Sequence, residues 1–215
     1  MLLTCGKQPT GTRLPRTTAQ GAPPASMRDR QRRREELIEI ACHIFAEKGF
    51  DGATLQDIAD QFGVLKGSLF HYIQSKDDLL FEIIDGVYAG AEDAIWPIAG
   101  ADDSAVSRLR RLIVAYVRYV TDHQPAITVW LHDLNSLEPE RSEVIRTREE
   151  HNRRRLVDLI RQAQQEGGVR RDTDPRLVGF ALLGSMNWVH RWFRPRGQSA
   201  EEIGLEFSRI YLGQL

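Results

Sequence analysis

TLQDIADQFGVLKGSLFHYIQSKDDLL, the stretch at residues 54–80, decides the fold because it predicts two short helices joined by a sharp turn and the start of a third. Thr54 precedes apolar residues at helical spacing, and Asp57 stands where a capping-box carboxylate reaches back to the Thr54 amide. Gly63 tolerates positive φ, so the first helix can end there and the chain can turn. The second helix is expected from about Lys66 to Ile73.

The third helix of this stretch begins with the same capping pattern. Ser75 and Asp78 predict a second capping box, which places Lys76 in the first turn of the helix. A lysine at that position opposes the helix dipole, so it carries a local cost in stability. We therefore expect Lys76 and the exposed amides of this helix end to share an anion such as a DNA phosphate.

A helix, a glycine turn and a second helix also occur in many small helical domains that bind no DNA, so the order of the neighbouring residues matters. The ordered set is Thr54, Ile58-Ala59, Gly63-Val64, Lys66-Gly67-Ser68-Leu69, His71-Tyr72 and Ser75-Lys76. With this set, residues 30 to about 85 resemble the whole DNA-binding domain of the TetR family of bacterial transcription regulators.

The resemblance implies which residues meet DNA. Phosphate contacts fall on Thr54, Tyr72 and Lys76, while other residues of the recognition helix lie near base edges. Two positions depart from the family pattern: Leu65 replaces a usual serine cap, and Phe70 replaces a common phosphate-binding tyrosine, so we expect Phe70 to contact a thymine methyl or a sugar. The full set implied to bind DNA is Thr54, Gln56, Lys66, Gly67, Ser68, Phe70, His71, Tyr72 and Lys76.

Composition adds little to the DNA-binding prediction but bounds the rest. The chain has 215 residues with 41% hydrophobic residues, enough for two modest domains, and a formal net charge of −1 that gives no nucleic-acid signature. The two cysteines predict no disulfide framework, which fits a cytoplasmic protein, and no apolar run predicts a membrane span. Local charge does help: Arg28, Arg30, Arg32, Arg33 and Arg34 precede the first helix core and can follow a phosphate backbone or be merely solvated.

The predicted fold is all-α with about nine helices. Residues 1–26 are expected to form a disordered tail, and Met27 is a possible natural start. Residues 27–75 are expected to form a helix-turn-helix DNA-binding domain, and residues 76–215 a larger helical domain for ligand binding and dimerisation. The helices are expected at about 29–48, 54–62, 66–73, 76–96, 106–120, 127–134, 139–167, 175–193 and 203–212.

The second domain is predicted to enclose an apolar ligand, because large aromatic residues recur on several of its helices. The alternative is that these aromatics fill an ordinary core. The charged segment RTREEHNRRR, residues 146–155, is either an exposed helix with ion pairs between turns or the mouth of a pocket that meets an anionic ligand. The candidate ligand-binding residues are Trp96, Tyr116, Tyr119, Trp130, Leu134, Arg146, Arg153 and Trp188.

A second, weaker resemblance concerns this domain. The charged helix followed by GSMNWVHRWFRPRG, residues 184–197, is similar to TetR regulators of fatty-acid and sterol breakdown, whose effectors include acyl-CoA thioesters. If it holds, an acyl chain or ring lies among the aromatics and a base such as Arg146 or Arg153 meets the CoA part. The family also implies a homodimer through the last two long helices, which are apolar enough to form it.

The prediction is therefore a ligand-responsive repressor that binds a near-palindromic operator in double-stranded DNA as a dimer. Two other classes stay open: a helical scaffolding or binding dimer without specific DNA recognition, and an all-α enzyme acting on an acyl thioester. Catalysis is not expected, because the sequence has no Gly-rich phosphate loop, nucleophile elbow or zinc-ligand spacing, and its six histidines are scattered singly. No cofactor and no metal are expected.

Overall fold

The computed structural model describes the backbone of residues 25–212 and the side chains of residues 29–212. The predicted tail thus lies outside the described residues except for its last two positions, which belong to the first helix. The described chain is all-α, as predicted. Its elements are α1 (Ala25–Gly52), α2 (Leu55–Phe62), the 3-10 helix η1 (Lys66–His71), α3 (Lys76–Ala94), α4 (Trp96–Ala99), α5 (Ala105–Asp122), α6 (Gln124–Asp133), the 3-10 helix η2 (Leu134–Ser136), α7 (Pro139–Gln165), α8 (Pro175–Trp192) and α9 (Ala200–Tyr211).

The capping residues predicted for α2 and for the start of α3 are confirmed, whereas α1 extends beyond the predicted range of 29–48 at both ends, from Ala25 to Gly52, with a kink at Gly49. Both predicted capping boxes are formed, at Thr54 with Asp57 and at Ser75 with Asp78. Gly63 ends α2 with φ 75°, and Gly49 has φ 73°, so both glycines occupy the left-handed region that other residues rarely adopt. Local chemistry alone therefore sets these ends.

Two predicted helices differ from the structure. The segment expected to be helical from Lys66 to Ile73 is a 3-10 helix that ends at His71, held by bonds such as that from the Ser68 amide to the Leu65 carbonyl. The Leu65 side chain cannot accept a hydrogen bond and so does not cap this helix. The first amides of the helix are satisfied instead by the tighter 3-10 hydrogen bonds. The helix expected from residue 76 to 96 ends at Ala94, because Pro97 cannot donate to the preceding turn; Pro97 lies in the first turn of the short α4, which begins at Trp96.

The buried apolar residues form two cores. The first unites α1, α2, η1 and the first half of α3, with Leu37, Phe45, Ile58, Leu69 and Leu80 at most 1% exposed. Cys42 packs against this core, and burial raises the pKa of its thiol to about 12. The second core lies among α4, α5, α7, α8 and α9, together with the second half of α3.

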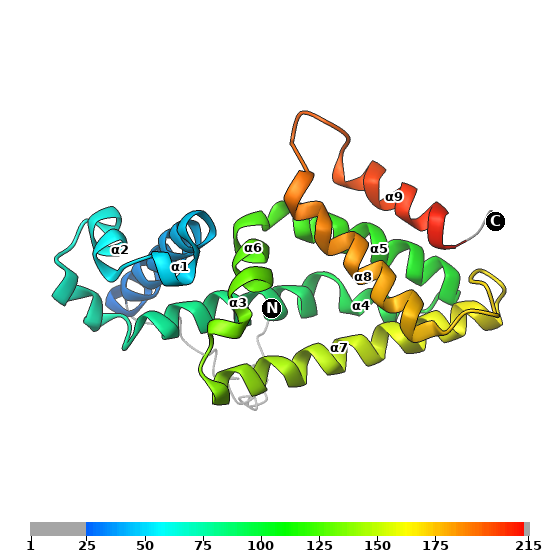
Figure 1. Ribbon diagram of the computed structural model, residues 1–215, viewed down its shortest axis with the longest axis horizontal. Helices are drawn as coiled ribbons and strands as arrows, with labels where there is room; N and C mark the ends of the chain where they lie inside the picture. The colour runs from blue at the N-terminus through cyan, green and yellow to red at the C-terminus, as the bar shows by residue number, and fades with distance from the viewer. Residues whose placement is uncertain (1–24, 213–215) are drawn as a thin grey trace, which may run out of the picture.

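Helix α3 connects the two cores (Figure 1). Leu80 and Ile84 are buried in the first core, whereas Val87 belongs to the second. Val129 of α6 and Ile145 of α7 also pack into the first core. The domain boundary that the sequence placed at residue 75 stays a prediction; η1 and α3 both contribute side chains to the first core. Among residues 25–212, no helix is both long enough and apolar enough to span a membrane.

Helix α5 is the centre of the second core and approaches α9 very closely. An added Cβ at Gly204 of α9 would lie 2.7 Å from the Cα of Val114 on α5, which is backbone and cannot rotate away. The two helices can keep this spacing only with glycine at residue 204.

We expect Gly204→Ala to lower the free energy of unfolding by about 1 to 3 kcal/mol, because α9 must move off α5 to admit the methyl group. Urea unfolding followed by circular dichroism measures the change. Gly86→Ala in α3 is the matched control, since nothing lies within 4 Å of its added Cβ; it should be neutral or slightly stabilising. Equal behaviour of the two variants would contradict the close packing of α5 and α9.

Candidate DNA-binding head and ligand cavity

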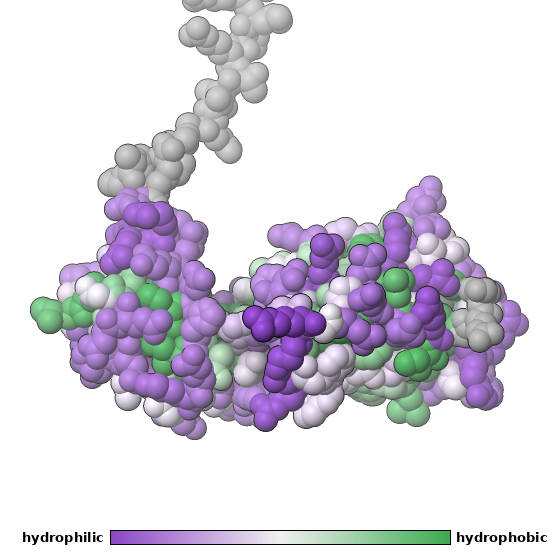
Figure 2. Space-filling view, turned by 90° about the horizontal axis from the view of Figure 1, so that it is seen from above, coloured by the Kyte–Doolittle hydropathy of each residue, from purple (hydrophilic) through white to green (hydrophobic). Residues whose placement is uncertain are grey.

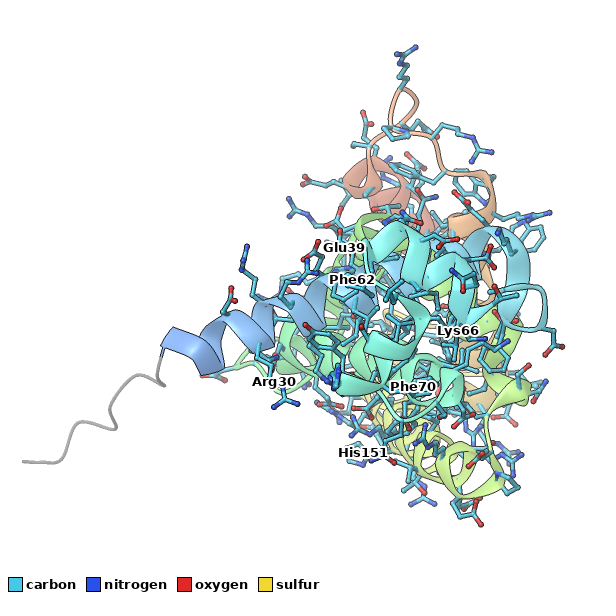
Figure 3. All side chains as sticks on the ribbon, turned by 90° about the vertical axis from the view of Figure 1, so that its left-hand side faces the viewer. Arg30, Glu39, Phe62, Lys66, Phe70 and His151 are labelled. Carbon is cyan, nitrogen blue, oxygen red and sulfur yellow. The ribbon has the colours of Figure 1, made fainter. Side chains whose placement is uncertain are left out.

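The recognition segment η1 projects from one end of the molecule (Figure 3). Leu69 is fully buried and anchors the segment in the first core, while Lys66, Gly67 and Phe70 are exposed. Ser68 is half-buried and His71 is exposed. Lys66 and Phe70, which the sequence assigned to base readout, are therefore accessible and Ser68 partly so, while their contact with bases stays a prediction.

The predicted phosphate-binding residues surround this segment. The Thr54 hydroxyl accepts from the Asp57 amide and donates to Asp57 Oδ2 at 2.7 Å, so its proton is already in use. Gln56 is exposed and donates to Asp60 at 2.7 Å. The ring of Tyr72 packs edge-on against Phe62, with centroids 5.5 Å apart. DNA contacts from these residues stay predictions.

Lys76 has a structural role that the sequence did not reveal. Its Nζ donates to the carbonyls of Phe50 at 2.7 Å and Ala53 at 3.0 Å, and it lies 4.1 Å from the centre of the Phe50 ring. The Phe50 carbonyl belongs to the last residues of α1, and Ala53 directly follows that helix. The lysine that opposes the α3 dipole thus binds backbone oxygens at the end of α1, leaving one N–H for a phosphate.

Three arginines of α1 contact the other elements of the DNA-binding head. Arg30 donates to the His71 carbonyl at 3.1 Å, and Arg33 stacks over the Phe62 ring at 4.1 Å. Arg34 forms a bidentate pair with Glu82 of α3. The side chain of Arg28 lies outside the described part of the chain. Part of the predicted basic cluster therefore holds the head together, which sequence alone could not separate from phosphate binding.

A ladder of ion pairs joins α3 to α7, and we call it the α3–α7 ladder. Its rungs are Asp78 with Arg141, Asp85 with Arg148, and Glu92 with Arg155. The partners differ by 63 positions in every rung, and successive rungs are seven residues apart, so the two helices run parallel in register. Seven residues are close to two helical turns, which keeps all rungs on one side of each helix.

The rung nearest the DNA-binding head is the most buried. Arg141 donates to Asp78 and lies 2.7 Å from Asp77 in a charge contact that is not aligned as a hydrogen bond, and the two aspartate side chains are only 15% and 12% exposed. Burial pushes the pKa of Asp78 upward. Hydrogen bonds from Arg141 and the amides of Gln74 and Ser75 outweigh burial and hold that pKa below its usual value.

A cavity of about 220 Å³ lies between α3 and α7 within the second half of the ladder. Helices α4, α5, α6 and α8 complete its wall. Its lining is largely aromatic and apolar, with a few polar groups from α7 and α8. The lining residues used below are Tyr88, Ala91, Trp96, Tyr116, Tyr119, Trp130, Glu149, Asn152, Arg153, Phe180 and Asn187.

Three tyrosine hydroxyls inside the cavity are tied to fixed partners. Tyr88 donates to Glu149 Oε1 at 2.9 Å, Tyr116 to Asn187 Oδ1 at 2.8 Å, and Tyr119 to the Val87 carbonyl at 2.9 Å. Burial raises the pKa of all three hydroxyls, that of Tyr119 to about 12. The tyrosines are therefore neutral hydrogen-bond donors at neutral pH and do not act as bases.

Five of the eight predicted ligand-binding residues line this cavity: Trp96, Tyr116, Tyr119, Trp130 and Arg153. Three do not. Leu134 packs against the first core, Arg146 is exposed beside Glu143, and Trp188 is 60% exposed on α8. Sequence reasoning also missed Tyr88, Glu149 and Asn152. A sequence signal was available for Tyr88: it lies three residues before Ala91, so the two residues share one face of α3.

The outer faces of α8 and α9 expose large apolar side chains. Leu177, Phe180, Trp188 and Trp192 follow one another along α8, and Ile210 of α9 is 70% exposed. Apolar patches correspondingly interrupt the polar surface at this end of the molecule (Figure 2). A contiguous face of this kind is typical of a protein–protein interface.

Comparisons with known proteins agree with this architecture. Residues 37–83 match the family of bacterial regulatory proteins, tetR family, and residues 102–215 match the tetracyclin repressor-like C-terminal domain. The transcriptional repressor KstR2 of Mycobacterium tuberculosis is 32% identical over 184 residues, which cover 84% of this chain and 92% of that protein.

Two solved structures are also similar. The ketosteroid transcriptional regulator KstR2 of M. tuberculosis superposes with a TM-score of 0.78 at 31% identity, over 84% of this chain and 93% of that one. AibR in complex with isovaleryl coenzyme A and operator DNA gives a TM-score of 0.78 at 26% identity, over 85% of this chain and 100% of that one.

A helix-turn-helix head on a larger helical domain with an internal cavity defines a ligand-responsive, DNA-binding transcription regulator. The chain belongs to the TetR family, as the sequence of its head predicted. The predicted likeness to sterol-related regulators is confirmed by the two KstR2 comparisons. Regulators of this family are dimers, which accounts for the apolar face of α8 and α9.

We expect Arg141→Gln to lower the free energy of unfolding at neutral pH by about 1 to 3 kcal/mol, between the values for exposed and buried ion pairs. Because the pKa of Asp78 is lowered in the folded state, its contribution is present above the unfolded pKa of about 4 and is lost as the pH falls. The difference between variant and parent should therefore shrink below about pH 4.

Urea unfolding at a series of pH values measures this difference. Arg146→Gln on the same helix is the control, because its side chain is 66% exposed and lies 3.8 Å from Glu143. A loss of stability in Arg141→Gln that stays constant from neutral to acid pH would contradict the role given to the Asp78 carboxylate.

Proposed function

We propose that the protein is a repressor that binds a near-palindromic operator as a dimer and releases it when a coenzyme A thioester with a compact apolar acyl group occupies the cavity. The observation that carries the proposal is the aromatic cavity against α3, the helix that also holds the DNA-binding head. Such a regulator works where bacterial DNA is, in the cytoplasm.

The size and borders of the cavity support this effector class. A volume of about 220 Å³ is below the roughly 300 to 1,000 Å³ of most ligand pockets, so it suits an acyl group without the nucleotide. At the cavity rim, Arg153 lies over the Phe180 ring at 5.8 Å. A neighbouring groove between α7 and α8 shares these two residues and also carries Arg154, Arg161 and Arg176, together with the acidic residues Glu150 and Asp158. Each arginine is paired with a carboxylate: Arg153 and Arg154 with Glu150, Arg161 with Asp158, and Arg176 with Asp174. We infer that the phosphates of the coenzyme exchange with these carboxylate partners.

The structure offers a route from the cavity to the head. Tyr88 of α3 packs edge-on against Trp130 of α6, with centroids 5.6 Å apart, and both rings line the cavity. From the same helix, Val129 is fully buried in the first core. An acyl group that enters between Tyr88 and Trp130 would push α3 and α6 apart. This movement would change the spacing of the two recognition segments in the dimer. A coupling of about 1 to 3 kcal/mol changes operator affinity roughly 5- to 150-fold.

The primary experiment is a fluorescence-anisotropy titration of the protein against DNA from upstream of its own gene, at a fixed and stated salt concentration. We expect tight binding that short-chain or steroid-derived acyl-CoAs weaken, while free coenzyme A does not. Lys66→Ala should lose operator binding and keep its dimer mass and helical content, because its exposed side chain supports no core. Binding that is weak and equal on all DNA would contradict the repressor and favour a scaffolding dimer.

The proposal also assigns the protein no catalytic step. After release of the operator, mass spectrometry should recover the thioester intact, at the amount added. Hydrolysis or transfer of the acyl group at a rate that depends on the protein would instead establish the thioester-processing enzyme.

Filling the cavity should separate DNA binding from ligand response. Ala91 lines the cavity, so Ala91→Leu should keep operator affinity within about twofold and reduce the acyl-CoA effect at least tenfold. Ala89→Leu is the control, because Ala89 is exposed on the same helix. The titration above measures both variants. An undiminished acyl-CoA effect in Ala91→Leu would place the effector elsewhere.

A further inference from the structure

The recognition segment carries two uncovered apolar side chains. Leu65 is 82% exposed, which is the highest value for any large apolar residue in the described part of the chain, and Phe70 is 53% exposed. The Leu65 side chain caps no amide of η1, and within residues 29–212 it belongs to neither apolar core. Exposed apolar groups on a binding surface gain free energy when a partner removes them from water.

Leu65 and Phe70 lie toward the two ends of the recognition segment. Leu65 is its N-cap, with φ −69° and ψ 143°, and Phe70 lies within the 3-10 helix Lys66–His71. Because a 3-10 helix has three residues per turn, Gly67 lies directly before Phe70 on one edge. Gly67 has no side chain, and an added Cβ there would meet no atom within 4 Å, so the approach to the Phe70 ring is open along the helix. Lys66 follows Leu65 directly and is exposed.

The charge of the recognition segment indicates which kind of partner contacts Leu65 and Phe70. From residue 63 to 76 the chain holds two lysines and no acidic residue, so its surroundings favour an anionic partner. Within the major groove of DNA, the thymine C5-methyl is the apolar group that the four base pairs offer. An apolar face of a second protein copy would match Leu65 and Phe70 but would leave Lys66 without a counter-charge.

We propose that Leu65 and Phe70 are specificity-determining residues that read thymine methyl groups in each operator half-site. This inference rests on the proposed repressor function and names what its head recognises. It assigns base readout to Leu65, at a position where the family commonly has a polar cap, and makes the exposed leucine and phenylalanine act as a pair.

The test begins with operators enriched from a random DNA pool by the full-length protein. Each thymine of the enriched site is then replaced by uracil, which removes the methyl group and leaves the hydrogen-bonding edge unchanged. For two thymines in each half-site, one read by Leu65 and one by Phe70, we expect each single replacement to lower the affinity about fourfold, the factor that burial of one methyl group gives. Replacing a symmetric pair should lower the affinity of the dimer about 15-fold.

Variants of the protein then show which thymine each of the two side chains contacts. Leu65→Ala and Phe70→Ala should each bind the uracil and thymine forms of one position equally, while keeping the discrimination at the other. Val144→Ala is the control, since Val144 is an exposed apolar residue of α7 far from η1 in the sequence, at 45% exposure, and it should keep both effects. Circular dichroism and sedimentation of every variant check that fold and dimer are unchanged.

The outcomes separate this inference from the repressor proposal. Tight binding to an enriched site that tolerates uracil at every position overturns thymine readout and leaves the repressor standing. Failure to enrich any sequence overturns the repressor and the inference with it. A change of oligomeric state in Leu65→Ala or Phe70→Ala, with uracil sensitivity kept, overturns the inference in favour of contact with a second copy.

Discussion

The structure depends on one constraint: α3 is a continuous helix whose two halves are buried in different cores. A helix holds its length because every residue adds a backbone hydrogen bond, so α3 cannot shorten or bend cheaply between the cores. In the proposed ligand response, a displacement at Tyr88 would therefore be carried along α3 to its Ser75 cap. Helix α3 has no proline between Lys76 and Ala94 and is therefore continuous, whereas Pro97 prevents it from continuing past the cavity.

Sequence patterns predicted the parts of the fold that local chemistry decides. Thr54 and Gly63 mark helix ends because their side chain, or the lack of one, satisfies the backbone within a few residues. Lys76 shows where such reasoning stops. Its position suggested an anion, but its ammonium reaches carbonyls 23 and 26 residues away in the sequence. Only the tertiary fold brings these carbonyls to it, and no spacing rule could reveal them.

The cavity was predicted in kind but only partly in its lining, for a related reason. Helix α8 is apolar on more than one face, and its sequence does not state which face turns inward. Asn187 faces the cavity, whereas its neighbour Trp188 faces outward with the exposed apolar surface. Glu149 was overlooked because a carboxylate in a run of charges is usually solvated. Glu149 is half-buried, and the Tyr88 hydroxyl offsets this partial burial by donating to it.

The α3–α7 ladder gives these separate features a common geometry. The Tyr88–Glu149 bond lies between the Asp85–Arg148 and Glu92–Arg155 rungs, and Glu149 directly follows Arg148 in the chain. A ligand that displaces the Tyr88 hydroxyl must therefore act against two ion pairs as well as one hydrogen bond. Those pairs are 29–43% exposed, where ion pairs are weak, while the Asp78–Arg141 rung near the head is the most buried. The ladder is therefore weaker at the cavity than at the head, and the displacement of α3 proposed above would pivot about the Arg141 rung, which keeps the DNA-binding domain attached to α7.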